Sequence, residues 1–300
     1  CQLFAFRFPR TGTLGDLRAR LERIVWGNDP LVTRVPPPAR PVIRHYLQSF
    51  FTRMPSDFDL RGASLGNLVI AGGYLRCGRR MEPVIRRLSH LCAVRGTVRP
   101  VVNGSFHLVA QLQDGRRLVG QHLLTGKEVP PIPVPVVQVY LTRESRQDRP
   151  VEVTISPAVK RLIREAELIC YPMGSFYSSL IANLLPRGVG EAIQENPCPK
   201  IYLPNVGADP EQLGLSLSRC VETLLAYLQR GCSRPVPAEK LLHFVLIDSR
   251  HAQAFPPREC ARIRRMGIEL LDRPLITGQS APCWDEERLV PLLLSLLKER

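Results

Sequence analysis

Residues 168–185 read LICYPMGSFYSSLIANLL, and this stretch decides the fold class. A short apolar strand, Leu168–Tyr171, leads through the turn Pro172–Ser175 into a helix predicted over Ser178–Leu185. A helix is expected before it at Ser156–Ala166. After it, strands and helices go on alternating, with strands expected at Lys200–Leu203, Leu241–Asp248 and Ile268–Leu271 and helices at Ser216–Gln229, Pro257–Met266 and Asp285–Lys298. This order predicts an α/β fold with a doubly wound, mostly parallel, Rossmann-like sheet.

In the first half of the chain, the spacing of apolar residues predicts helices followed by a β-hairpin, rather than alternating strands and helices. Apolar residues at helical spacing predict helices over Leu14–Val25, Pro41–Met54, Ser64–Leu75 and Glu82–Val94. Two alternating runs, Phe106–Gln113 and Arg116–Leu123, flank Asp114-Gly115 and predict a β-hairpin, and a further strand is expected at Val134–Leu141. We interpret residues 1–300 as a single domain, with a helical and hairpin insertion over about 35–150.

The composition excludes several classes of protein. With 44% hydrophobic and 23% charged residues, the chain is not expected to be disordered. No apolar run approaches the roughly 18 residues of a membrane span, so we expect a cytoplasmic protein that does not enter a membrane. The nine cysteines form no CxxC pair, which argues against a zinc site and favours buried thiols.

The basic excess, a net charge of +14, is carried almost entirely by arginine. Two dense clusters, residues 76–87 and 258–265, fall on predicted amphipathic helices and are typical of solvated helix faces. No RNP-like aromatic motif or basic arm accompanies them. We therefore do not expect nucleic acid to be the partner.

Ligands of a doubly wound sheet bind outside the carboxyl ends of its strands, which directs attention to residues 172–179. A helix start rich in hydroxyls, at Ser175, Tyr177, Ser178 and Ser179, offers N–H groups and a positive dipole end to a phosphate, and Gly174 permits close backbone approach. The alternative is structural: Ser175 caps the helix and Gly174 makes the turn. No Gly-Lys-Ser/Thr follows, so this is not a Walker P-loop.

Three other places carry candidate residues, each with a structural alternative. Asn205 follows the next strand with Asp209 and Glu211 nearby, and is either a nucleotide contact or part of a polar turn. Asn67 enters an apolar helix, where a buried amide needs partners, so it either ties down a loop backbone or points at a ligand. Asp16 and Arg18 lie at a predicted helix start. Asp16 is an acid of the first helical turn, and Arg18 is either an exposed side chain or a phosphate ligand.

These places together resemble the 2-phospho-L-lactate transferase (CofD)-like family, which includes gluconeogenesis-factor-like proteins that bind UDP-sugars. The ordered matches are Gly15–Arg18, Ser64–Leu68, the hairpin Leu108–Gly120, Ala166–Leu185 with Gly-Ser-Phe-Tyr-Ser-Ser, and Lys200–Asn205. The amino-acid sequence over Met54–Leu75, Val119–Glu128 and Ile169–Gly190 is similar to that of the GAK-system CofD-like subgroup, whose members occur together with an ATP-grasp enzyme.

The resemblance implies a transferase that moves a phosphorylated group from a nucleoside-diphosphate donor to an acceptor hydroxyl with help from Mg²⁺. The alternative is a non-catalytic nucleotide-sugar-binding regulator. By resemblance, the nucleotide contacts are Asp16, Arg18, Asn67, Gly174, Ser175, Tyr177, Ser178, Ser179 and Asn205. No general base or metal ligand follows from the resemblance; Asp209 and Glu211 are the candidates named for the base. The expected partners are a nucleoside-diphosphate-type molecule, an ATP-grasp protein and, as one oligomeric state, a second copy of the chain.

The sequence also departs from the family pattern. Pro172-Met173-Gly174-Ser175 replaces the usual Gly-Pro-Gly-Ser, and residues 207–211 stand where the gluconeogenesis-factor branch has Met-Thr-Gln-x-Gly-Glu-Thr. The family's first strand, its glycine-rich turn and the acidic loop after it are missing. Because the chain opens with Cys1 rather than Met, we interpret it as a fragment that lacks an N-terminal βα unit.

Overall fold

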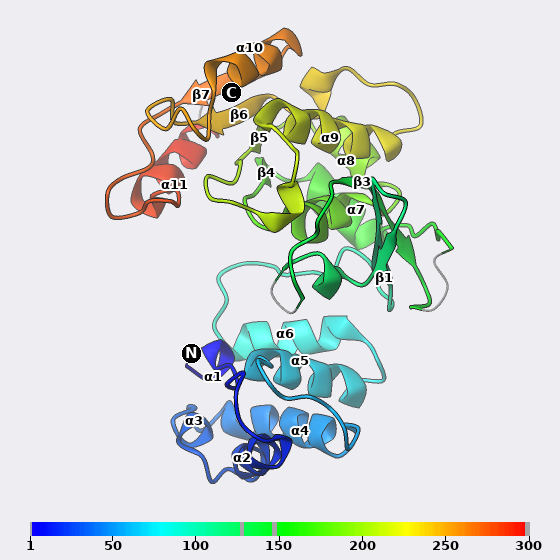
Figure 1. The fold of residues 1–300 in the computed structure, drawn as a ribbon, viewed down its shortest axis with the longest axis vertical. Coiled ribbons are helices and arrows are strands. Elements are labelled where there is room, and N and C mark those ends of the chain that lie inside the picture. The colour runs from blue at the N-terminus through cyan, green and yellow to red at the C-terminus, as the bar shows by residue number, and fades with distance from the viewer. Residues whose placement is uncertain (1, 127–128, 146–148, 298–300) are drawn as a thin grey trace. The chain divides into compact units, whose positions relative to one another are not determined.

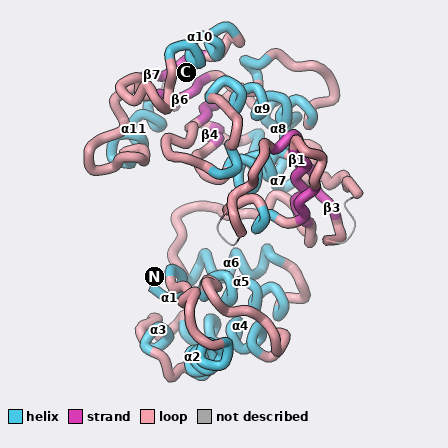
Figure 2. Tube along the Cα trace, in the orientation of Figure 1, coloured by secondary structure: helices cyan, strands magenta, loops and turns pink. Residues whose placement is uncertain are grey.

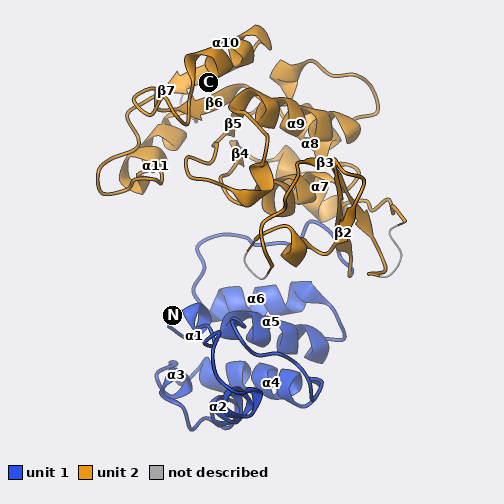
Figure 3. Ribbon diagram, viewed as in Figure 1, with its two compact units in different colours: residues 1–104 blue, residues 105–300 orange. Residues whose placement is uncertain are grey.

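The computed structural model describes residues 2–126, 129–145 and 149–297. Its residues group into two compact units, 1–104 and 105–300 (Figure 3), which are described separately. The single-domain organisation stays a prediction. Cys1 and Lys298 lie outside the described residues.

Unit 1 is helical, as its apolar spacing predicts. Its helices are α1 (Gln2–Ala5), α2 (Leu14–Trp26), α3 (Pro30–Thr33), α4 (Arg40–Phe51), α5 (Leu65–Arg76) and α6 (Met81–Leu91) (Figure 1). Ser64 caps α5, since its hydroxyl accepts a hydrogen bond from the Asn67 N–H at 3.4 Å. The short α3 was not predicted; Asp29 caps it and Pro30 opens it.

Helices α4 and α5 pack with almost no space between their backbones. A Cβ added at Gly72 would lie 1.8 Å from the carbonyl oxygen of Tyr46, and Gly73 faces the Tyr46 ring. Buried Leu47 and Val69 belong to the surrounding core. Glycine at 72 therefore sets how closely the two helices approach.

Unit 2 begins with a three-stranded antiparallel sheet in the order β2-β1-β3, formed by β1 (His107–Leu112), β2 (Arg117–Val119) and β3 (Val136–Thr142). The predicted hairpin is confirmed: Gly115 has a φ of 87° and its N–H donates to the Leu112 carbonyl at 3.0 Å. The second strand is shorter than predicted. Gly120, with φ 112°, turns the chain into a 3₁₀ turn over Gln121–Leu123.

The second sheet is parallel, with strands β4 (Ile169–Tyr171), β5 (Lys200–Tyr202), β6 (Phe244–Ile247) and β7 (Glu269–Asp272) in chain order. Its helices are α7 (Pro157–Arg164), α8 (Val189–Glu195), α9 (Leu217–Arg230), α10 (Pro257–Arg265) and α11 (Glu286–Ser295). The α/β prediction with its inserted hairpin is confirmed (Figure 2). No reversal of strand order occurs among the strands that the structure describes.

The helix predicted over Ser178–Leu185 is the main local difference. The chain forms a π-helical turn, Phe176–Leu180, followed by a 3₁₀ turn, Ile181–Leu184. The Ser175 carbonyl accepts hydrogen bonds from the N–H groups of both Ser179, at 2.9 Å, and Leu180, at 3.2 Å, so the first turn is wide. Helix α8 was not predicted at all.

None of the described helices is long and apolar enough to span a bilayer.

Candidate functional site

Parallel pairing brings together the loops that follow β4 and β5. Tyr171 is in register with Tyr202, and the Leu203 N–H donates to the Tyr171 carbonyl at 2.9 Å. The carboxyl ends of both strands therefore open on the same edge of the sheet, where ligands of such sheets bind. The candidate residues of unit 2 all stand in or next to these two loops.

Asn205 fastens the two loops to each other. Its Oδ1 accepts a hydrogen bond from the Gly174 N–H at 2.9 Å, and its Nδ2 donates to the Gly174 carbonyl at 2.7 Å. Gly174 has a φ of 138°, which a side chain would strain. The structural alternative for Asn205 and Gly174 is thus realised in this chain, and their nucleotide-binding role stays a prediction.

Two carboxylates occupy the start of the π-helical turn. Asp209 accepts a hydrogen bond from the Phe176 N–H at 2.8 Å. Fully buried Glu211 accepts from the N–H groups of Tyr177 and Ser178, both at 2.8 Å, and from the Ser178 hydroxyl at 2.6 Å. We name this arrangement the carboxylate cap.

The carboxylate cap corrects the expectation of free N–H groups for a phosphate. The unpaired N–H donors of a helix start attract an anion, and here the chain supplies its own from residues 209–211. The N–H groups of residues 176–178 are therefore already engaged.

The cap also places an acid in an apolar setting. Burial raises the pKa of the Glu211 carboxyl above its ordinary value, against the opposing effect of the hydrogen bonds from Ser178 and Tyr177. Both oxygens of Asp209 are engaged too, since Oδ1 accepts from the Glu211 N–H at 3.1 Å. Neither acid is placed as a free general base.

Ser175 is left out of the cap. It precedes the π-helical turn, yet its side chain makes no capping hydrogen bond. Its half-buried side chain lines a cavity instead. The structural alternative for its hydroxyl, a helix cap, is therefore wrong.

The cavity beside Ser175 has a volume of about 550 Å³, within the usual range for small-molecule sites. We call it the β4–β5 cavity. Besides the two loops, the segment 282–286 lines it, which sequence reasoning missed. Trp284 belongs to that segment and is held by a hydrogen bond from its Nε1 to the Pro204 carbonyl at 2.9 Å. The lining residues are Thr125, Met173, Gly174, Ser175, Asn205, Val206, Gly207, Ala208, Asp209, Pro210, Pro282, Cys283, Trp284, Glu286 and Leu289.

The charge of this lining is acidic. Of the described residues around the β4–β5 cavity, none is Lys, Arg or His, and two, Asp209 and Glu286, are acids. Such a wall suits the uncharged parts of a nucleotide, such as a ribose or a sugar, better than a bare phosphate. Exposed Glu286 makes no hydrogen bond or ion pair with the described residues, which sets it apart from Asp209.

The other predicted hydroxyls do not line the cavity. Tyr177 is buried, its hydroxyl donates to the Val136 carbonyl at 3.4 Å, and burial raises its pKa. The Ser178 hydroxyl donates to Glu211, and Ser179 is exposed. For Tyr177 and Ser178 the structure shows packing and capping roles, and ligand binding stays a prediction.

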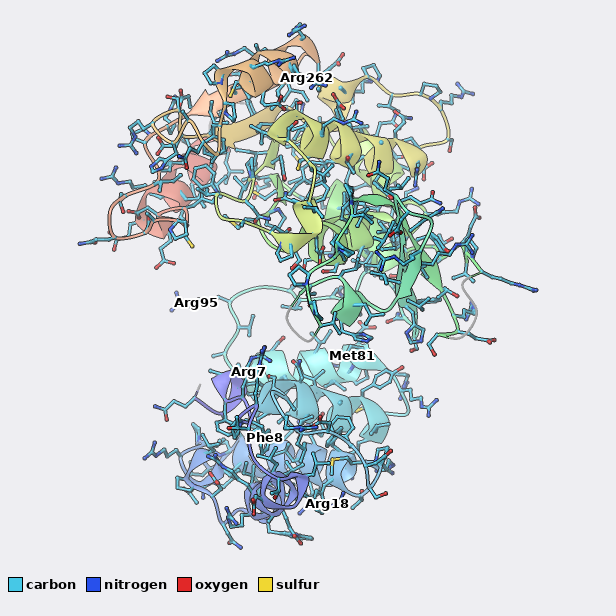
Figure 4. All side chains as sticks on the ribbon, viewed as in Figure 1. Arg7, Phe8, Arg18, Met81, Arg95 and Arg262 are labelled. Carbon is cyan, nitrogen blue, oxygen red and sulfur yellow. The ribbon has the colours of Figure 1, made fainter. Side chains whose placement is uncertain are left out.

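The remaining candidates belong to unit 1. Asp16 forms a capping pair with Thr13, whose hydroxyl donates to its Oδ2 at 2.7 Å. The Arg18 guanidinium (Figure 4) lies over the Phe51 ring at 5.5 Å. The Asn67 side chain is exposed, so the expectation of a buried amide is wrong: position 67 falls on the outer face of α5.

A magnesium ion finds limited support in the described residues. They contain no group of three or more His, Cys, Asp or Glu side chains that could hold a metal ion. Glu286 is the cavity acid whose oxygens are not bonded within the described chain, and Mg²⁺ is commonly held by one or two carboxylates together with ligand phosphates.

A family model described as 2-phospho-L-lactate transferase CofD matches residues 2–275. The chain belongs to the CofD family. It is 29% identical over 299 residues to the gluconeogenesis factor of Bacillus subtilis (strain 168), covering 96% of this CofD-family chain and 87% of that relative. It is 31% identical over 159 residues to the gluconeogenesis factor of Halalkalibacterium halodurans, 53% of this chain and 45% of the relative.

The fold of this CofD-family chain also has a solved counterpart. The crystal structure of a upf0052-family protein from Bacillus halodurans is similar with a TM-score of 0.61 at 21% identity, covering 96% of this chain and 89% of that one. This likeness shows the fold.

Proposed function

We propose that this chain binds a nucleoside-diphosphate-type small molecule in the β4–β5 cavity. The observation that supports the proposal is that different residues cap the helix start and line the cavity. Asp209 and Glu211 do the capping, while Ser175 lines the cavity and its hydroxyl makes no hydrogen bond with the described residues. Asn205 holds Gly174 beside it, which fixes the loop that presents this hydroxyl.

We propose that binding, rather than turnover, is the function: a nucleotide-sugar-binding regulator of the gluconeogenesis-factor type. The two acids first considered for the base, Asp209 and Glu211, spend their oxygens on N–H groups and a hydroxyl. The chain is also similar to relatives named gluconeogenesis factor.

A transferase remains the second candidate, and Glu286 favours it. This carboxylate lines the cavity and is not bonded within the described chain. Together with ligand phosphates it would hold a Mg²⁺, which would neutralise charge on the phosphate oxygens. The family description, 2-phospho-L-lactate transferase, is the other support.

Binding is tested by titrating the chain with uridine diphosphate and a uridine diphosphate sugar. Trp284 lines the cavity, so its fluorescence reports occupancy in a Trp26→Phe background that removes the other tryptophan. Losing one hydrogen bond in Ser175→Ala should weaken binding about 3- to 10-fold. The control is Asn183→Ala, which removes an amide bonded to the Ser179 carbonyl outside the cavity lining. Unchanged affinity in Ser175→Ala would show that the ligand binds elsewhere.

The same titration separates regulator from transferase. A regulator should bind equally well with Mg²⁺ or with a chelator, and should leave the nucleotide intact during prolonged incubation with candidate acceptors. A transferase should bind more tightly with Mg²⁺ and lose that gain in Glu286→Gln. Release of nucleoside monophosphate, followed by chromatography, would overturn the regulator assignment.

Finer features of the assignment stay proposals of their own. Membership of the GAK-system subgroup predicts a complex with an ATP-grasp enzyme, which co-purification of the two proteins tests. A homodimer is tested by light scattering on the purified chain.

A further inference from the structure

A second cavity, of about 610 Å³, opens on the surface of unit 1 between α4, α5 and α6. We call it the α4–α6 cavity. Three arginines, Arg76, Arg86 and Arg87, stand on its wall with two histidines, His45 and His90. Nothing in the proposed function uses these residues.

All three arginines are exposed, and no acid among the described residues pairs with their guanidinium groups. None of them makes an ion pair or a hydrogen bond with the described residues. The helices α4, α5 and α6 together contain one acid, Glu82, and it is paired with Arg99. Some arginines elsewhere in the chain are paired with an acid, as Arg262 is with Glu222 at 3.1 Å.

The floor of the cavity is not charged. Buried Tyr46 lies there, with Val42 and Pro83 beside it. Burial raises the pKa of the Tyr46 phenol, while the charges of Arg87 and Arg76 act on it in the opposite direction. The cavity therefore combines cationic side chains with a phenol and an apolar surface.

This combination specifies a ligand chemistry. Neighbouring guanidinium groups repel one another unless an anion lies between them, and the guanidinium fork matches the oxygens of a phosphate. Three unmatched arginines call for more negative charge than a single phosphate carries. A concave site of this volume accepts a small molecule.

We propose that the α4–α6 cavity binds a small molecule that carries two or more linked phosphate groups. Arg76, Arg86 and Arg87 hold its phosphates, and the Tyr46 side of the cavity contacts its carbon body when it has one. This site is built from residues other than those of the β4–β5 cavity and does not depend on what that cavity binds.

The test is calorimetric titration of the whole chain with inorganic tripolyphosphate at low salt. The decisive variant is Arg86→Gln/Arg87→Gln. The matched control is Arg264→Gln/Arg265→Gln, an adjacent pair of exposed arginines on α10 that removes the same charge from another helix. We expect the α6 pair to weaken binding at least about tenfold and the α10 pair to change it less than about twofold.

Two further measurements make the outcome decisive. Circular dichroism and a thermal melt show that the α6 pair still folds; should it not, Arg76→Gln alone replaces it. The α6 pair must leave the uridine diphosphate titration read by Trp284 fluorescence unchanged, which separates this site from the β4–β5 cavity. Equal losses in the two double variants would overturn the proposal, because binding would then follow net charge. Tighter binding of a single-stranded RNA, lost in the α6 pair, would also overturn it in favour of a nucleic-acid surface.

Discussion

At the scale of single residues, Glu211 has the most consequence for the site. It is fully buried and satisfies two N–H groups and one hydroxyl that open the π-helical turn. Glu211→Ala leaves these donors unpaired, so we expect it to destabilise the chain by about 2–4 kcal/mol. Urea unfolding measures the loss, and Ser175→Ala, which breaks no capping bond, should stay within about 0.5 kcal/mol of the parent chain.

The protonation of Glu211 gives a prediction with a definite sign. Burial raises its folded pKa above the unfolded value, so the folded state binds the proton more tightly. Its contribution to stability is therefore full at low pH and falls as pH rises through the raised pKa. Glu211→Gln stays neutral and keeps an oxygen for the N–H groups. Relative to this variant, the parent chain should lose stability as the pH rises above the ordinary pKa of a glutamate; a parallel pH course would contradict the assignment.

Asp248, at the carboxyl end of β6, should behave in the opposite way. The Arg250 guanidinium, with N–H groups from residues 275 and 276, holds the pKa of its carboxyl well below the ordinary value. Such a group contributes stability above its unfolded pKa and loses it as pH falls. Compared with Asp248→Asn, the parent chain should thus lose its advantage below about pH 4. Urea unfolding at several pH values, run beside the Glu211 series, makes the contrast visible.

At the scale of elements, the close approach of α4 and α5 is directly testable. A methyl group at Gly72 would fall on the Tyr46 carbonyl, so Gly72→Ala must push the helices apart. We expect a loss of about 3 kcal/mol or more. Gly15→Ala in α2 is the control, since its Cβ meets nothing closer than 3.7 Å, and alanine should stabilise that helix by up to about 1 kcal/mol. Thermal melts compare the two; equal Tm values would show that the helices have room to adjust.

Periodicity predicts most elements here, because strands and helices differ in the spacing of their apolar residues. It fails where a contact from far along the chain decides the geometry. The N–H groups at the start of the wide turn Phe176–Leu180 donate to carboxylates some thirty residues away. The local sequence contains no signal for a π-helical turn. Helix α8 was missed because residues 189–195 are short and bounded by no cap signal; Gly188 precedes it with a φ of 92°.

The candidate site was predictable to the level of its loops. Topology places the turn after β4 beside the turn after β5, so Gly174 and Asn205 could be brought together from the sequence. The sequence could not show which anion accepts hydrogen bonds from the N–H groups, because Asp209 and Glu211 are equally compatible with capping, general-base and metal-ligand roles. The position of Trp284 in the cavity lining could not be predicted from the sequence, since it depends on how residues 282–286 return to the sheet.

At the scale of the whole molecule, the net charge of +14 predicts weak, nonspecific attraction to polyanions. Several arginines are already paired, among them Arg61 with Asp59 and Arg116 with Asp114. We expect binding to duplex DNA at about 50 mM salt that vanishes by about 200 mM. Fluorescence anisotropy over a salt series checks this, and retention at the higher salt would restore nucleic acid as a partner.

The carboxylate cap has one more consequence, in terms of competition. Asp209 and Glu211 are tethered anions, present at the helix start at an effective concentration of order millimolar or above. A phosphate could bind those N–H groups only by displacing the carboxylates of Asp209 and Glu211, which are part of the chain and cannot diffuse away. At the proposed site, a phosphorylated ligand would therefore contact the edge of this loop, at Gly174 and Ser175. The groups around that edge, rather than the helix dipole, would discriminate among ligands.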